Sequence, residues 1–378
     1  MSLDVDLWIR KVRDAVLLER ITEAKERMAA AWNLKPVDRP PLSITCPPPE
    51  PWPTFEYSET FKDADKMLVS QLASAYSHCL LEDDGILCVR ANYGVGVIPS
   101  GFGSEIVVLE GMNQMPWVKE PIVRGDPPSA AELRVPNPRE DGLMGKVLDT
   151  EEYFVRKLNG TGVSVYLCDT QGPLDVAYLI RGAKLFKDFY LYPDFVRDLL
   201  GEVSRTYVDF SEMQKRVVRE PMRQATHGTP NVWMARGGTR LCEDVAVMLR
   251  PELYREFCTP VNELCLGQFD GGMGHFCSSE SSTGKHILNS VLSTTFLRAF
   301  FFGSPSRFYD LHETVKVFRQ KRVCLIWTDG PLPDQKPEDW VSSITEDLDD
   351  KTGVIFSISV QDFSLAREIS NLWRKSFD

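Results

Sequence analysis

Residues Thr295–Thr328, TFLRAFFFGSPSRFYDLHETVKVFRQKRVCLIWT, contain the pattern that decides the fold. The apolar runs Thr295–Phe302 and Val323–Thr328 predict two buried strands, and Tyr309–Gln320 between them predicts a helix. Two strands joined through a helix in this order lie parallel in one sheet. The stretch therefore predicts an α/β protein with a parallel sheet.

The same alternation of strand and helix runs through the rest of the chain. Further strands are predicted at Leu42–Cys46, Ile86–Arg90, Val163–Cys168, Ala225–Ala235, Arg240–Glu243, Met273–Cys277 and Val354–Ile358. Roughly eight strands separated by helices predict one (β/α)8 TIM barrel over residues 1–378, with a helical extension over residues 1–35. A doubly wound sheet is the rival fold, but the chain has neither a Gly-x-Gly-x-x-Gly motif nor a Walker loop.

Composition limits the classes of partner. The 378 residues include 43 Lys and Arg against 54 Asp and Glu, which gives a formal net charge of −11. Nucleic acids and anionic membranes attract basic faces, so we expect neither as a partner and expect a small-molecule substrate. No apolar run is long enough for a membrane helix, and the first ten residues lack the apolar core of a secretory signal. The nine dispersed cysteines favour reduced thiols in a cytoplasmic protein. The oligomeric state stays open, and a homodimer is one alternative.

The sharpest chemical signal is Gly271–Cys277, GGMGHFC. His275 and Cys277 stand two residues apart on a predicted strand, so their side chains point to the same side of the sheet. They lie at the carboxyl end of the strand, where the active sites of barrels are found. Both are zinc ligand types, although a catalytic zinc site needs a third protein ligand. The alternative is a buried cysteine beside a hydrogen-bonded core histidine.

The third ligand has several candidates. Cys242, Glu243 and Asp244 end a predicted strand and could supply a ligand or a general acid or base. The alternative for the two acidic residues is a favourable place before a helix N-terminus. Cys324 lies inside an apolar strand, which favours a place in the core.

Polar residues near other strand ends are candidates for binding substrate. Arg90 and Asn92 end the second predicted strand, and a guanidinium group suits a carboxylate. His227 lies in a polar cluster that either contacts substrate or caps a turn. Arg236 and Arg240 flank two glycines and either bind an anion or lie in a solvated loop.

Three segments together resemble the uroporphyrinogen decarboxylase superfamily. They are Gln171–Tyr178 (QGPLDVAY), Cys242–Phe257 (CEDVAVMLRPELYREF) and His275–Cys277 (HFC). The resemblance covers roughly residues 30–375 and implies a TIM barrel in which Gln171 and Tyr178 contact the substrate.

His275-x-Cys277 resembles the zinc motif of that superfamily's methylcobamide:thiol methyltransferases. In those enzymes zinc lowers the pKa of a thiol, which then takes a methyl group from a corrinoid. The resemblance implies zinc bound by His275 and Cys277 with Glu243 as third ligand, and catalysis by His275, Glu243 and His227. It also implies a corrinoid co-substrate, with a corrinoid protein as a possible partner.

The chain departs from that pattern near its last strand, where the family has a third cysteine ligand. Here the positions are Ser357 and Ser359, so Cys242 or Cys324 are alternatives to Glu243. Two other functions therefore remain open. One is metal-independent decarboxylation of uroporphyrinogen or a related tetrapyrrole acid, and the other is a non-catalytic barrel that binds a corrinoid or tetrapyrrole. In the decarboxylase interpretation the residues around the substrate are Arg90, Asn92, Tyr178 and His227.

Overall fold

The structure is a computed structural model that describes residues 3–111, 113–129, 133–348 and 350–377. Residues 1 and 2 of the expected N-terminal extension lie outside the described residues. Six strands form one sheet in the order β1 (Leu42–Thr45), β12 (Val354–Ser359), β11 (Cys324–Trp327), β10 (Leu297–Gly303), β9 (Gly272–Cys277) and β8 (Thr239–Cys242). All neighbours in this sheet are parallel, and β2 (Cys88–Arg90) and β5 (Ser164–Tyr166) form a separate parallel pair. The predicted α/β class with a parallel sheet is confirmed.

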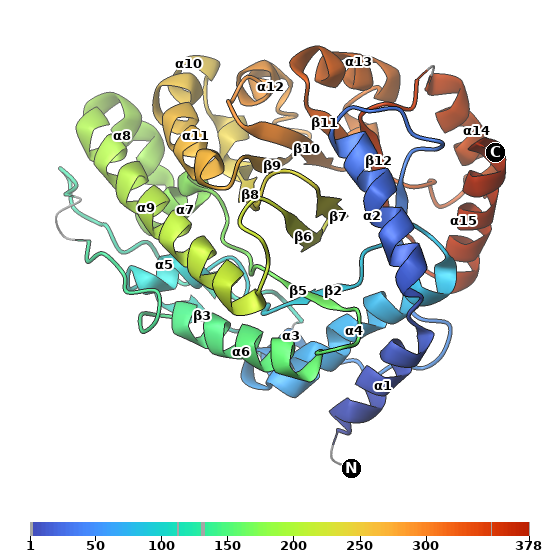
Figure 1. The fold of residues 1–378 in the computed structure, drawn as a ribbon. Coiled ribbons are helices and arrows are strands. Elements are labelled where there is room, and N and C mark those ends of the chain that lie inside the picture. The colour runs from blue at the N-terminus through green and yellow to red at the C-terminus, as the bar shows by residue number, and fades with distance from the viewer. Residues whose placement is uncertain (1–2, 112, 130–132, 349, 378) are drawn as a thin grey trace.

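Helices surround the strands in Figure 1. The longer ones are α1 (Val5–Ala15), α2 (Leu18–Trp32), α4 (Ala64–Leu81), α6 (Met144–Lys157), α7 (Pro173–Arg181), α9 (Pro193–Val218), α11 (Thr259–Gln268), α13 (Leu311–Lys321), α14 (Pro337–Asp347) and α15 (Phe363–Phe377). The short ones are α3 (Tyr57–Lys62), α5 (Val97–Gly101), α8 (Leu185–Leu191), α10 (Pro251–Leu253) and α12 (Lys285–Val291). Tyr254–Cys258 is a π-helical turn, and Gly182–Lys184, Asp244–Met248 and Pro305–Arg307 are 3₁₀ turns. A small antiparallel pair, β3 (Ile106–Val107) and β4 (Trp117–Val118), lies between α5 and α6 in the chain.

The strand–helix–strand unit at residues 295–328 forms as predicted, with β10, α13 and β11 in order. Asp310 caps α13 by accepting a hydrogen bond from the Glu313 backbone N–H. The helix buries Leu311, Thr314, Val315 and Phe318, and its last turn is followed by Arg322 in the left-handed conformation. Burial of that apolar stripe explains why α13 packs against the sheet and returns the chain to start β11.

Strands are present at Ala225–Ala235 as predicted, but they do not join the parallel sheet. They form an antiparallel hairpin of β6 (Ala225–Gly228) and β7 (Asn231–Met234), because Pro230 lacks the N–H that would continue a ladder. In Figure 1, β6 and β7 lie near the centre of the molecule, between the six-stranded sheet and the β2–β5 pair. Their buried side chains join those of the sheet in one apolar cluster that includes Val232, Met234, Met273 and Ile326.

The helical extension predicted over residues 1–35 contains two helices, α1 and α2, because Val16 and Leu17 between them are extended. Met28 and Trp32 of α2 belong to the same buried cluster as the β6–β7 hairpin. The N-terminal segment therefore covers apolar side chains of the hairpin and the sheet, rather than standing apart from them.

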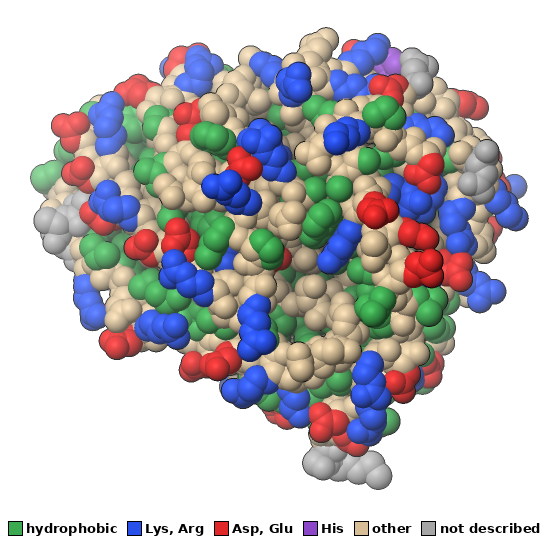
Figure 2. All heavy atoms as spheres, viewed as in Figure 1, with side chains coloured by type: hydrophobic (Ala, Val, Ile, Leu, Met, Phe, Trp, Pro, Cys, Tyr) green, Lys and Arg blue, Asp and Glu red, His purple; other side chains and the backbone are tan. Residues whose placement is uncertain are grey.

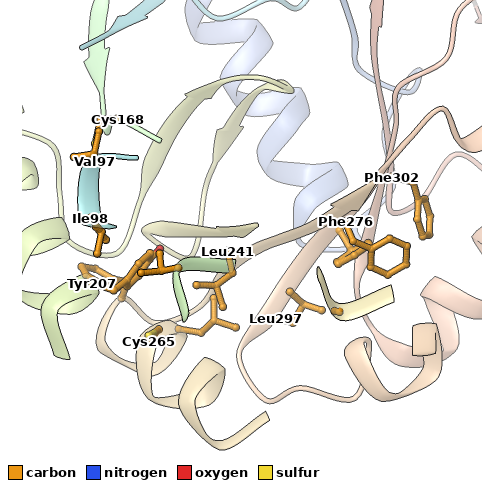
Figure 3. Close-up of a cluster of buried hydrophobic side chains, with 14 of the residues drawn as sticks. Val97, Ile98, Cys168, Tyr207, Leu241, Cys265, Phe276, Leu297 and Phe302 are labelled. Atoms are coloured by element: carbon orange, nitrogen blue, oxygen red, sulfur yellow. The ribbon is translucent and has the colours of Figure 1, made fainter. Parts of the chain in front are cut away.

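Side chains alternate between the two faces of the sheet, and this alternation sets up the site. Leu241 of β8 lies with Tyr207 of α9 and Cys265 of α11 in Figure 3, among the side chains that pack on the helices. Phe276 and Phe302 point to the same helical layer. The alternate residues along these strands, such as Met273 of β9 and Phe301 of β10, face the interior, where they share a buried cluster with the hairpin.

The outer surface mixes charges. Lys and Arg side chains are interspersed with Asp and Glu on the face shown in Figure 2. Among the described residues, no helix combines the length and the apolar character that crossing a bilayer requires.

Candidate active site with a metal-donor cluster

A cavity of about 450 Å³ lies where the carboxyl ends of the strands meet the β6–β7 hairpin. Its walls include residues from β5, β8, β9, β10 and β12. The ones that matter chemically are Tyr166, Arg240, His275, Phe301, Ser357 and Ser359. This is the end of a parallel sheet at which ligands are ordinarily bound, since the loops there can bring many side chains together.

Strand register brings the donor side chains together. Cys242 of β8 is the partner of His275 on β9, and Phe301 of β10 is the partner of His275 on the other side. The ligand atoms of Cys242, Asp244 and His275 all lie within 4.8 Å of one another. Cys277 Sγ lies 3.3 Å from His275 Nε2, so a second thiol borders the cluster. We call Cys242, Asp244, His275 and Cys277 the donor cluster.

A backbone carbonyl sets the tautomer of His275. Its Nδ1 lies 3.2 Å from the Phe301 carbonyl oxygen, which can only accept, so Nδ1 carries the proton and donates. Burial is the main cause that lowers the pKa of His275 to about 4, and the positive charge of Arg240 adds to it. The ring is therefore neutral at pH 7, and the Nε2 lone pair faces Cys277 and Asp244. Metal-binding histidines typically have this arrangement.

The two thiols of the donor cluster are protonated at neutral pH. Burial raises the pKa of Cys277 to about 12, with a further contribution from Asp244, and burial raises that of Cys242 well above its ordinary value. A cation bound here would displace those protons, because metal ligation requires the thiolate. Sulfur, nitrogen and carboxylate oxygen are together a donor set that fits Zn²⁺.

Asp175 of α7 holds Asp244 in place. Its carboxylate accepts hydrogen bonds from the backbone N–H groups of Asp244 and Val245, at 2.8 and 2.9 Å. Asp244 in turn accepts from the Cys277 backbone N–H at 2.7 Å, and its oxygen lies 3.5 Å from His275 Nε2. The acidic residue in the Gln171–Tyr178 segment thus orients a donor and does not itself enter the cluster.

Glu243, the third ligand expected from the sequence, points away from the donor cluster. Its carboxylate accepts from Tyr254 Oη and from Asn262 Nδ2, each at 2.6 Å. Both partners follow β8 in the chain, Tyr254 in the π-helical turn and Asn262 in α11. Burial raises the pKa of Glu243 to about 7, despite these two hydrogen bonds.

A second group of charged side chains surrounds Asp169. Arg90 and Arg240 both approach its carboxylate, and Gln171 Nε2 donates to it at 2.6 Å. His227 is buried on the hairpin, with its ring 5.0 Å from that of Tyr166. Burial is the first cause that lowers the pKa of His227 well below its ordinary value, and Arg240 and Arg90 add to it.

Other candidates from the sequence lie apart from these two groups. Tyr178 is half-buried against Phe186, at a ring distance of 5.8 Å. The backbone N–H of Asn92 contacts Met67 Sδ. Cys324 is fully buried among the apolar side chains around the hairpin. Ser357 and Ser359 line the cavity as hydroxyls, and Ser357 Oγ accepts from the Asn231 backbone N–H.

The sequence did not single out Asp169, Tyr166 or Phe301. A signal existed for Asp169, because it directly follows the predicted strand Val163–Cys168, and polar residues at that position face the ligand end of a sheet. The aromatic residues gave no such signal, since Tyr and Phe are ordinary strand residues.

Fold and site together define an α/β protein with a parallel sheet and a cluster of sulfur, nitrogen and oxygen donors at its carboxyl end. No family model and no curated protein sequence matches the chain. Among solved structures, the chain is similar to a methyltransferase from Methanosarcina mazei, with a TM-score of 0.64 and 14% sequence identity. The match covers 94% of this chain and 99% of that one, and it shows the shared fold.

Proposed function

We propose that this chain transfers a methyl group between a corrinoid and a small thiol, with zinc held by the donor cluster. The observation that carries the proposal is the convergence of Cys242, Asp244 and His275 on one another within 4.8 Å. The name of the structural neighbour and the resemblance of His275-x-Cys277 to a zinc motif support the same chemistry. A corrinoid protein as the methyl carrier belongs to this proposal.

The same proposal extends to the architecture. We take β1, β2, β5 and β8–β12 as the eight strands of one TIM-barrel domain, in chain order. The parallel direction of every pair among them and the helices between them support this assignment. The position of the donor cluster at the carboxyl ends supports it as well.

Each donor-cluster residue has a distinct task. His275 offers its Nε2 lone pair, because the Phe301 carbonyl retains the Nδ1 proton. Asp244 offers a carboxylate oxygen while Asp175 fixes its backbone. Cys242 and Cys277 are the sulfur donors, Cys242 from the end of β8 and Cys277 from the end of β9. Bound zinc would lower the pKa of a substrate thiol so that a thiolate is present at neutral pH.

Metal analysis of the protein expressed with added zinc tests the proposal. We expect about one zinc per chain, lost in His275→Ala and bound at least about tenfold more weakly in Asp244→Asn. Glu243→Gln is the matched control and should keep its zinc, because the Glu243 carboxylate is occupied by Tyr254 and Asn262. Zinc-free wild-type protein, or loss of zinc in Glu243→Gln alone, would contradict the assignment.

Activity is tested with methylcob(III)alamin and a small thiol. The visible spectrum of the cobalamin should change as it loses its methyl group, and the methyl thioether should accumulate in equal amount. His275→Ala should abolish both signals. A zinc-loaded wild-type protein that leaves methylcob(III)alamin unchanged with a range of thiols would sink the methyl-transfer proposal.

A further inference from the structure

We propose that the protein binds a small organic anion at a second site, at the amino-terminal end of β5 and away from the donor cluster. The site is a cavity of about 500 Å³ between the last turns of α6 and α9, α2 and the β6–β7 hairpin. We call it the amino-end cavity. Its occupant carries an anionic head group on an apolar body. The inference does not rest on the proposed function and involves no metal.

The amino-end cavity is separate from the cavity beside the donor cluster. It is lined by Val163, just before β5, and by Ser164 and Val165 of β5. Tyr166, the last residue of β5, lines the other cavity instead. Among the described residues, none lines both cavities. The volume lies within the range of roughly 300–1,000 Å³ that small-molecule sites occupy, so a ligand fits here without touching the donor cluster.

The first argument is the charge on the wall. Three charged side chains line the amino-end cavity, those of Lys25, Arg219 and Glu220. The Glu220 carboxylate is already engaged, because it accepts hydrogen bonds from the Lys215 ammonium, at 2.8 Å, and from the Thr226 backbone N–H. Burial raises the pKa of Glu220, whereas the charges of Lys215 and then Lys25 lower it. In the described part of the chain, Lys25 and Arg219 have no ion pair and no side-chain hydrogen bond. Two free cations on one wall suit an anionic head group.

The second argument is the apolar part of the wall, which favours an organic anion over an inorganic one. It consists of Val155 and Leu158 of α6, Val163, Val218 of α9 and the ring of Trp233. The Lys25 ammonium lies 5.7 Å from the centroid of the Trp233 ring, so a cation and an aromatic surface adjoin each other. A phosphate or sulfate ion would leave this apolar surface in contact with water. An apolar body attached to the head group would cover it, which is favourable.

The third argument is that the wall is fixed before any ligand arrives. Lys215 is fully buried and donates to the Glu220 carboxylate and to the backbone carbonyls of Pro221 and Gln224, at 2.8, 3.2 and 2.9 Å. These three acceptors lie in the segment between α9 and β6, and all three residues line the amino-end cavity. A preformed wall lowers the conformational entropy that binding costs.

Calorimetric titration of 2-naphthoate into the full chain tests the inference. The uncharged amide 2-naphthamide has nearly the same shape and should bind at least about tenfold more weakly. Lys25→Met keeps an apolar side chain of similar length and should weaken 2-naphthoate binding about tenfold, because it removes the charge. The matched control is Lys35→Met, an exposed lysine shortly after the same helix, which should bind like the wild type.

A second pair of variants tests the other cation. Arg219 is exposed, so Arg219→Gln should weaken 2-naphthoate binding less, by about threefold. Arg322→Gln is the matched control. Both arginines are exposed and follow a helix in the left-handed conformation, with φ of 60° and 58°, so any effect on the helix end is common to both variants.

A third pair tests the location without touching a charge. Val155 is half-buried on α6, and Val155→Trp should fill the amino-end cavity and abolish saturable binding. Val317→Trp, at an exposed valine of α13, should leave binding unchanged.

Three results would overturn the inference. They are equal binding of 2-naphthoate and 2-naphthamide, equal weakening in Lys25→Met and Lys35→Met, and unchanged binding in Val155→Trp. The last result would show that 2-naphthoate binds elsewhere, such as in the cavity beside the donor cluster. If Lys25→Met does not fold, the comparison of Arg219→Gln with Arg322→Gln decides on the charge, and equal affinities there would contradict the inference. Failure of methyl transfer would not affect these measurements, because they use neither zinc nor a corrinoid.

Discussion

At the scale of single residues, neighbours decide what each titratable group at the site can do. The Phe301 carbonyl keeps the His275 lone pair on Nε2, and Asp175 turns the Asp244 carboxylate toward Cys277. Glu243 is adjacent in sequence to both Cys242 and Asp244, yet it makes its hydrogen bonds on the opposite side of the strand. The donor cluster is therefore a product of side-chain direction as much as of residue type.

The raised pKa of Glu243 predicts a specific pH dependence of stability. Burial raises this pKa to about 7 from an ordinary value near 4.5, so the folded state binds the proton more tightly than the unfolded state. The resulting stabilisation is present below about pH 4.5 and is lost as the pH rises to about 7, by on the order of 3 kcal/mol. Urea unfolding of metal-free protein at pH 5 and pH 8 should show this loss. Glu243→Gln cannot titrate at this position, so this part of the loss in the free energy of unfolding should be missing from the variant. An identical dependence on pH in both proteins would refute the raised pKa of Glu243.

At the scale of elements, close approach of β8 and β9 sets the spacing of the donors. Thr239 pairs with Gly272 in the register that also pairs Cys242 with His275. A Cβ atom on Gly272 would lie 2.1 Å from the Thr239 carbonyl oxygen, which is backbone and cannot turn away. The absence of a side chain at Gly272 is thus a requirement for the donor cluster three residues further along the strand.

Gly272→Ala should consequently destabilise the fold by about 3 kcal/mol and weaken zinc binding, because β8 must move away from β9. Gly201→Ala in α9 is the control, since the nearest atom to its new Cβ would be 3.8 Å away. In that helix the substitution should stabilise by about 0.5–1 kcal/mol. Denaturant unfolding and zinc titration measure both effects. Similar stability of the two variants would show that the Thr239 carbonyl oxygen does not obstruct a Cβ atom on residue 272.

At the scale of the whole molecule, the last helix packs beside the first strand of the sheet. Trp373 of α15 is fully buried, packs on Trp340 and Phe356, and donates from Nε1 to the Pro40 carbonyl at 2.9 Å. Pro40 leads into β1, and β1 pairs with β12. One side chain therefore links the C-terminal helix to the edge of the six-stranded sheet.

Trp373→Ala should lower the free energy of unfolding by about 3–5 kcal/mol, because it leaves a large cavity and an unpaired carbonyl. Leu372→Ala, at the half-buried position beside it, should cost clearly less. Urea unfolding compares the two. A loss in Trp373→Ala no larger than that in Leu372→Ala would show that α15 does not anchor the first strand.

The sequence by itself determined the local units and the pair of residues that lead to the site. Apolar runs and a capped helix predict β10, α13 and β11, because burial and hydrogen bonding within a few residues are enough to favour them. The spacing of His275 and Cys277 predicts that both face one side, because strand geometry repeats every two residues.

Only the tertiary structure decided the rest of the site. Alternation would also have placed Cys242 and Asp244 on one side and Glu243 on the other, but β8 ends at Cys242 and local pattern does not say how the backbone continues. Asp244 keeps its direction through Asp175, which comes from another helix 69 positions earlier. The β6–β7 hairpin likewise turns inward because Asn231 binds the backbone of Ile86. Contacts between residues so far apart form only when the whole chain folds, which is why no local pattern reveals them.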